Sequence, residues 1–268
     1  KVHARKKPLA EDVSLSDVAK ATSGFTGADL ENLLNEAALL SAREDRRFIT
    51  RQDLHEAMMK VIAGPEKRSR VVTPHARRLT AYHEAGHAVV IHELDSQDPV
   101  HQITIVPRGQ AGGMTISLPR EDRAYLSKRE LEERIAVCLG GRVAEQLVLN
   151  DISTGASSDI QKASQTARAM VTKYGMSDEL GLVSYDSDEE VFLGRDYGHT
   201  KGYGENVASK IDSEVKRIVD ECYDKAKAII LDHRDVLDAA AALLLEKEKI
   251  SRDEFEALFE KEEAVPAV

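Results

Sequence analysis

The feature that most constrains this chain is a short histidine motif inside an apolar helical pattern, His83-Glu84-Ala85-Gly86-His87. Residues four apart on an α-helix lie about 40° apart around its axis, so both imidazoles can reach one metal ion. Zinc accepts neutral imidazole and carboxylate ligands, and a catalytic zinc site leaves one position for water. Glu84 lies beside the first histidine, where its carboxylate can act as a general base. The small residues between the histidines allow another element or a substrate to approach the helix closely.

An accidental pair of surface histidines is the alternative interpretation of this motif. A chance match to such a pattern in a chain of this length has a probability of roughly one in a hundred. Flanking Ala81 and the run Ala88–Ile91 make the helix apolar on most faces. Burial of His83 and Glu84 would therefore be costly without a partner, and a metal ion supplies one. We interpret the motif as the active site of a zinc metalloprotease.

Two acids are candidates for the third metal ligand. Glu145 lies in the helical pattern after Gly140-Gly141, and Asp159 follows the glycine-containing turn Thr154–Ser158. Each of them is also compatible with a simple surface or helix-capping role. His92 is excluded, because the metzincin spacing requires a histidine six residues after the second ligand, with an intervening glycine. The residues alone leave both acids open.

Composition argues against several other classes of protein. The formal net charge of −10 disfavours nucleic-acid binding, which needs a concentrated excess of Lys and Arg. The longest apolar run, Ala239–Leu245, is too short to span a membrane, and no signal peptide opens the chain, so we expect a soluble fragment. Cys138 and Cys222 each lie in an apolar helical pattern, which favours buried thiols in a reducing compartment over a disulfide.

The N-terminal quarter, residues 14–63, is predicted to form a compact helical unit. Thr26 is the expected N-cap of one helix and Thr50 of the next, and Gly64-Pro65 ends the second. Apolar residues recur at helical spacing in both segments. They are Leu30, Leu33, Leu34, Ala37 and Ala38 in the first segment, and Leu54, Ala57, Met58 and Val61 in the second.

The rest of the chain is predicted to be mostly helical, with one β-hairpin. After a basic linker, Thr73-Pro74 starts the helix of the metal motif. Alternating apolar residues predict two strands joined by a glycine-containing turn. Further helices follow, then a short strand, a surface loop and a helical tail. The ranges are 101–107 and 114–119 for the hairpin, 127–149 and 157–174 for helices, 180–185 for the strand, 186–204 for the loop and 205 onward for the tail. The fold class is therefore mainly α with a small β-hairpin or sheet.

At these residues the chain resembles the FtsH family of membrane-anchored, ATP-dependent zinc proteases. The metal motif, the run Thr154–Asp159 and Tyr174-Gly175-Met176-Ser177 follow one another in the family's order. The resemblance implies that Asp159 completes the zinc site with the two motif histidines and that Glu84 is the catalytic base. It leaves Glu145 as a supporting acid beside the site.

The start of the chain resembles part of an AAA+ ATPase. Gly24–Leu30 is similar to the small helical lid of such domains, and Lys1–Leu9 to the exit from the large subdomain. By this resemblance Gly27 and Ala28 lie near the nucleotide base; the alternative is that they only begin a helix. No Gly-x-x-x-x-Gly-Lys-Ser/Thr loop occurs, so ATP and Mg²⁺ are expected only in the full-length protein. The implied domains are the AAA+ lid at 1–64, a linker at 65–77 and the zinc metalloprotease domain at 78–268.

The resemblance implies a zinc-dependent endopeptidase that degrades unfolded or membrane-extracted proteins, coupled to ATP-driven translocation in the full-length protein. It also implies a homo-hexamer at the cytoplasmic face of the inner membrane, anchored by an N-terminal segment missing from a chain that begins at Lys1. Strand 101–107 is either a substrate-binding edge or an ordinary sheet edge. The alternative function is a non-proteolytic hexameric assembly module of an AAA+ chaperone, which the intact Glu84 disfavours. A purely structural zinc site is also disfavoured, because four Cys or His ligands usually close one.

Overall fold

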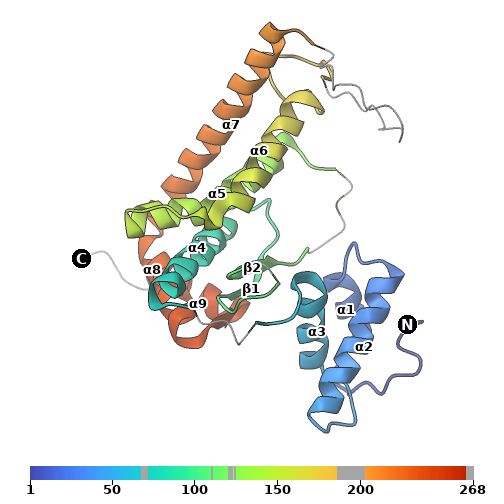
Figure 1. Ribbon diagram of the computed structural model, residues 1–268. Helices are drawn as coiled ribbons and strands as arrows, with labels where there is room; N and C mark the ends of the chain where they lie inside the picture. Colours follow the sequence, from blue (N-terminus) through green and yellow to red (C-terminus); the bar gives the residue numbers. More distant parts are fainter. Residues whose placement is uncertain (68–71, 110, 120–122, 124, 186–202, 264–268) are drawn as a thin grey trace.

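A computed structural model describes residues 1–67, 72–109, 111–119, 123, 125–185 and 203–263, with side chains described up to residue 260. Within these ranges the chain is mainly helical and carries one small antiparallel sheet (Figure 1). The predicted fold class is therefore confirmed.

Three helices form an N-terminal unit beside the sheet: α1 (Leu15–Ala21), α2 (Gly27–Arg43) and α3 (Arg51–Ala63) (Figure 1). Thr26 and Thr50 start α2 and α3 with reciprocal capping boxes, each formed with the aspartate three residues later. Gly64 follows α3 with a φ of +83°, a conformation that favours glycine. The predicted starts of both helices and the predicted end of α3 are confirmed.

A larger helical unit holds the metal motif. α4 and α5 pack against each other, α6 and α7 pack against α5, and α8 packs against α4. Thr73 caps α4 as predicted, with Pro74 in the first turn. The bounds are α4 Pro74–His92, α5 Lys128–Leu149, α6 Ser157–Thr172, α7 Glu205–Asp232, α8 Arg234–Lys247 and α9 Arg252–Glu263, with a 3-10 turn at Thr154–Ala156.

α4 and α5 cross at very short range because three glycines lie at the contact. A Cβ atom added to Gly86 would lie 2.6 Å from the carbonyl oxygen of Gly140, and one added to Gly140 would lie 2.8 Å from that of Gly86. A Cβ atom on Gly141 would lie 2.6 Å from the imidazole of His83. The small residues between the histidines therefore admit another helix, as one of the two sequence expectations stated.

The sheet contains three strands in the order β2-β1-β3: β1 (Val100–Thr104), β2 (Met114–Ser117) and β3 (Lys249–Ser251). β1 and β2 form the predicted hairpin, with Ile103 opposite Thr115. β3 pairs with the other side of β1. The expectation that strand 101–107 forms a sheet edge is therefore wrong, because β1 is central and β2 lies at an edge of the described sheet.

Two further expectations need correction. Residues 180–185 do not form a strand: the Tyr185 N–H donates to the Thr172 carbonyl at 2.8 Å, and Leu180 is buried in the core of the larger unit. The helical tail is interrupted at His233 and by β3. The loop expected at 186–204 lies outside the described residues except for its last two positions.

Cys138 and Cys222 are both free thiols. Cys222 is buried, as expected, whereas Cys138 is only half-buried. Among the described helices, none is long and apolar enough to cross a membrane.

Candidate metal centre

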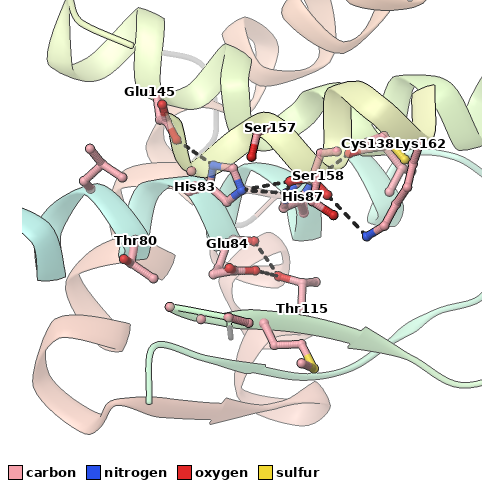
Figure 2. A pocket seen from close by; sticks show the side chains of 18 of the residues that line it. Thr80, His83, Glu84, His87, Thr115, Cys138, Glu145, Ser157, Ser158 and Lys162 are labelled. Atoms are coloured by element: carbon pink, nitrogen blue, oxygen red, sulfur yellow. Dashed lines mark hydrogen bonds and ion pairs between the residues drawn. The ribbon is translucent and has the colours of Figure 1, made fainter. Parts of the chain in front are cut away.

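A cavity of about 750 Å³ opens along α4, between the helices that follow it and the hairpin. The motif histidines and Glu84 lie on its floor, and Figure 2 shows Glu145 on one side and Thr115 on the other. The residues that line this cavity include His83, Glu84, His87, Gly113, Thr115, Glu145, Asp159 and Lys162.

His83 and His87 point toward each other, with 3.1 Å between their Nε2 atoms. The His83 Nδ1–H donates to Glu145 Oε1 at 2.7 Å, and the His87 Nδ1–H donates to the Val137 carbonyl at 2.7 Å. Both partners only accept hydrogen bonds, so the Nδ1 atoms hold the protons and the Nε2 lone pairs are available. This arrangement orients metal-ligating histidines in proteins.

Asp159 brings a carboxylate to the same point from the first turn of α6. Its Oδ2 lies 3.4 Å from Nε2 of His83 and 3.7 Å from Nε2 of His87. Within the described ranges, these three residues are the one group of His, Cys, Asp or Glu whose ligand atoms all lie within 4.8 Å of one another. Two imidazoles and one carboxylate suit a catalytic zinc ion.

The electrostatics of this cluster favour a bound cation. Burial opposes protonation of His83, but hydrogen bonds with Asp159 and Glu145 outweigh it and raise the pKa of His83 to about 10. Burial likewise opposes ionisation of Asp159, yet its hydrogen bonds with the two histidines hold its pKa below the usual value. The two carboxylates thus favour positive charge at the His83 imidazole, and Asp159 lies on the Nε2 side, where a metal ion would supply that charge.

Glu145 is fully buried on the opposite side of His83 from Asp159. Its other contacts are the backbone N–H of Ser153 at 2.9 Å and the Ser153 hydroxyl at 3.1 Å. Although burial opposes its ionisation, hydrogen bonds from His83 and Ser153 lower the pKa of Glu145. Arg142 is 4.0 Å away and donates instead to the Ser153 carbonyl. Glu145 therefore faces Nδ1 of His83, and Asp159 faces Nε2.

Glu84 is buried between α4 and β2, where the Thr115 hydroxyl lies 2.9 Å from its Oε2 (Figure 2). Burial raises the pKa of Glu84, although the nearby histidines and Thr115 oppose this shift. A carboxylate with a raised pKa accepts a proton more readily than an ordinary one near neutral pH. This property suits a general base.

Five candidate residues from the sequence meet here, and two do not. His83, Glu84, His87, Glu145 and Asp159 line one cavity. Gly27 and Ala28 are exposed at the start of α2, with His3 as the neighbour of Gly27, and do not line that cavity. Sequence reasoning missed Thr115 and the contact of Gly141 with His83. The glycine pair before Met114 was the available signal for a strand that lies close to the helix.

The comparison with known families agrees with this geometry. Residues 70–258 match Peptidase family M41, and residues 12–56 match the AAA+ lid domain. The first match covers well over half of the chain. The chain belongs to peptidase family M41. The matched M41 region contains the histidine motif, Asp159 and the whole sheet, while the AAA+ lid match falls on α1–α3.

Curated M41 relatives are similar over nearly the whole chain. An "ATP-dependent zinc metalloprotease FtsH 1" of Thermoanaerobacter sp. (strain X514) is 55% identical over 98% of this chain and 43% of the relative. The FtsH of Caldicellulosiruptor bescii is 56% identical over 96% of this chain and 42% of the relative. That of Bacillus subtilis (strain 168) is 48% identical over 97% and 41%. The chain thus spans about two fifths of the length of these relatives.

Proposed function

We propose that this chain is the peptidase part of a zinc-dependent endopeptidase that acts on unfolded protein, with His83, His87 and Asp159 as zinc ligands and Glu84 as the catalytic base. The observation that carries the proposal is the meeting of two Nε2 lone pairs, one carboxylate and a buried general base in a single open cavity. Membership of family M41 and relatives named zinc metalloproteases support it.

The chain's own residues account for the proton transfers of peptide hydrolysis. Zinc, when bound, supplies Lewis-acid activation of water and of the substrate carbonyl. The Glu84 carboxylate takes the proton of the attacking water and delivers it to the nitrogen of the departing amine. Glu145 keeps the proton of His83 on Nδ1. The rival function, a non-proteolytic assembly module, does not require a buried carboxylate in this place.

We propose that extended substrate binds along β2. This strand lies at an edge of the described sheet and lines the cavity beside Glu84. An added strand would form backbone hydrogen bonds that tolerate many sequences. N-methylation of substrate amides next to the scissile bond should then raise KM, whereas methylation several residues away should not. Equal KM values for both peptides would argue against pairing with β2.

For the full-length protein we propose coupling to ATP-driven translocation through the AAA+ domain, with ATP and Mg²⁺ bound there and Gly27 and Ala28 near the nucleotide. We further propose a homo-hexamer that is anchored at the cytoplasmic face of the inner membrane and degrades unfolded or membrane-extracted proteins. The AAA+ lid match supports the ATPase connection. Size measurement and membrane fractionation of the full-length protein test these points.

The central experiment compares Glu84→Gln with the unaltered chain. The variant should keep zinc and lose hydrolysis of unfolded casein by about a hundredfold or more, the usual contribution of a general base. Glu221→Gln, at an exposed carboxylate on α7, is the control and should behave like the unaltered chain. Wild-type turnover in Glu84→Gln would remove this residue from the mechanism. An unaltered chain without zinc and without hydrolysis would overturn the function itself.

A further inference from the structure

β2 lies between the catalytic base and the N-terminal unit. Side chains alternate between the two faces of a strand, so Thr115 and Ile116 point in opposite directions. Thr115 lines the cavity of the metal centre. Ile116 instead belongs to the buried core of the N-terminal unit. One strand thus joins two parts of the molecule that the domain boundaries separate.

The attachment to the N-terminal unit is apolar, with one fully packed residue at its centre. Ile116 is 6% exposed and packs within the cluster that holds α2 and α3 together. Met114 and Leu118, two residues to either side, pack against the same cluster. Met114 and Ile116 therefore lie on one face of β2, Leu118 follows directly after the strand, and all three pack against the N-terminal unit. The buried residues of that cluster are Ala4, Leu33, Leu34, Ala37, Ile49, Leu54, Ala57, Met58, Met59 and Ile116.

A buried arginine fixes the hairpin to the same unit at a second point. Arg108, in the turn after β1, is 3% exposed. Its Nη2 donates to Glu56 of α3 at 2.6 Å and to Glu66 at 2.7 Å, and its Nη1 donates to the Gly64 carbonyl at 3.3 Å. The hairpin is therefore held to the N-terminal unit both by its strand and by its turn.

The opposite face of β2 contacts Glu84 of α4. The Thr115 hydroxyl lies 2.8 Å from the Glu84 carbonyl oxygen and 2.9 Å from its Oε2, so the one hydroxyl proton has two acceptors in the same residue. A Cβ atom on Gly113 would lie only 2.9 Å from Cγ of Glu84. The strand is thus close enough for a small shift to change the hydrogen bond to the base.

We propose that Thr115 is a positioning residue for Glu84, and that the packing of Ile116 in the N-terminal unit keeps it in place. The inference rests on the proposed peptidase function. α4 sets the direction of the Glu84 side chain, and the hydrogen bond from β2 selects the carboxylate orientation that reaches the attacking water. Displacement of the N-terminal unit from β2 then lowers peptide hydrolysis without any change in the metal ligands.

The first test removes the hydroxyl and keeps the shape of the side chain. Thr115→Val should lower kcat for a short peptide by about tenfold, the usual loss for one hydrogen bond to a charged group. KM and zinc content should not change. Thr115→Ser keeps the hydroxyl and should restore kcat to near the unaltered value. Unaltered kcat in the valine variant, or an equal loss in the serine variant, overturns the assignment.

The second test asks whether the N-terminal unit acts through Thr115. As a single substitution, Ile116→Ala should lower kcat severalfold. Combined with Thr115→Val, it should cause no further loss, because the effects of residues that act through one another are not additive. Ile49→Ala is the control, because it removes the same side-chain atoms from the same core. Ile49 does not lie on β2; its backbone forms a β-bridge with Leu9. This control should lower kcat by less than Ile116→Ala does. Additive losses, or an equal loss in the control, overturn the coupling.

Hydrogen exchange separates failure of this inference from failure of the proposed function. If no form of the chain hydrolyses peptides, the peptidase proposal fails, and the exchange rates still decide the role of Ile116. The β2 amides should exchange faster in Ile116→Ala than in Ile49→Ala. Equal protection of β2 in the two variants would mean that the N-terminal unit does not hold the strand.

Discussion

The two sides of the cavity are built in different ways. On the metal side, α4 and α5 meet backbone to backbone at Gly86 and Gly140, and both histidine rings are fixed by short hydrogen bonds from Nδ1. On the hairpin side, Glu84, the proposed general base, contacts β2 mainly through the Thr115 hydroxyl, and β2 in turn packs against the N-terminal unit. The metal side is held by close contacts within the larger unit, whereas the hairpin side also depends on its packing against the N-terminal unit.

This difference separates two ways to lose activity. Changes on the metal side should lower zinc binding and peptide hydrolysis together, because the proposed ligands are tightly packed and cannot shift to compensate. Changes on the hairpin side should leave the ion bound and lower the rate. Zinc content and kcat, measured on the same variants, therefore test the comparison directly.

The largest effect is expected at Asp159. Asp159→Asn removes the charge nearest both Nε2 atoms and should lower zinc affinity by more than about a hundredfold, beyond the range for groups that only orient a ligand. Glu145→Gln keeps an oxygen that can accept from His83 and should retain zinc with about tenfold weaker affinity. Zinc stoichiometry after mild chelation measures both. Retention in the first variant and loss in the second would exchange the two roles.

A smaller loss on the metal side is expected for Gly141→Ala. The new Cβ atom would lie 2.6 Å from the His83 ring, and the crossing of α4 and α5 leaves no room for relaxation. Zinc affinity and activity should fall in parallel by about tenfold or more. Gly204→Ala, at a position with no atoms within 4 Å of an added Cβ, is the matched control. If zinc affinity survives in Gly141→Ala, the metal side is less rigid than its geometry indicates.

The parts that sequence predicted are those with a local signal. Thr26 and Thr50 marked helix starts because a capping box involves residues three apart. The paired histidines marked a candidate metal site because helical spacing alone brings them together. Asp159 needed more: its turn suggested a fixed side chain, but only the family resemblance favoured it over Glu145. Its approach to both histidines depends on how α6 packs.

The parts that sequence did not predict depend on distant packing. Lys249–Ser251 is a three-residue strand that forms by pairing with β1. Because of this pairing, β1 is a central strand rather than the expected edge strand. Thr115 looked like one more residue of a hairpin. Its role follows from the position of Glu84 on one face of β2 and of the N-terminal unit on the other. Periodicity does not report such contacts.

On the hairpin side, Arg108→Gln should lower kcat with zinc content unchanged. The glutamine cannot span Glu56, Glu66 and the Gly64 carbonyl together, so the turn before β2 loses its main attachment. The junction should lose about 1–2 kcal/mol, less than for a fully enclosed ion pair because Glu56 is partly exposed. Arg168→Gln, at an exposed ion pair with Asp212, is the control. A fall in zinc content in Arg108→Gln would contradict the separation of the two sides.

The smallest effect concerns acid, which should loosen the hairpin side through the N-terminal unit. Arg46 donates two hydrogen bonds to Asp53, at 2.5 and 2.6 Å. These bonds lower the pKa of Asp53 to about 2; burial opposes the shift, and hydrogen bonds from Thr50 add to it. A lowered folded-state pKa gives stability that is present above the unfolded value of about 4 and is lost as pH falls toward 2.

This pair should contribute about 1 kcal/mol to the N-terminal unit at neutral pH, below the full linkage value because Arg46 is partly exposed. Asp53→Asn should remove that contribution, and the free energy of unfolding should then depend less on pH between about 4 and 2. Chemical denaturation, monitored by hydrogen exchange in α2 and α3, measures both effects. Since the N-terminal unit supports β2, the variant should also show slightly faster exchange in β2 at neutral pH, with zinc binding unaffected. Unchanged β2 protection alongside a destabilised α3 would show that the hairpin side stands without its neighbour, and the contrast between the two sides would then lose its basis.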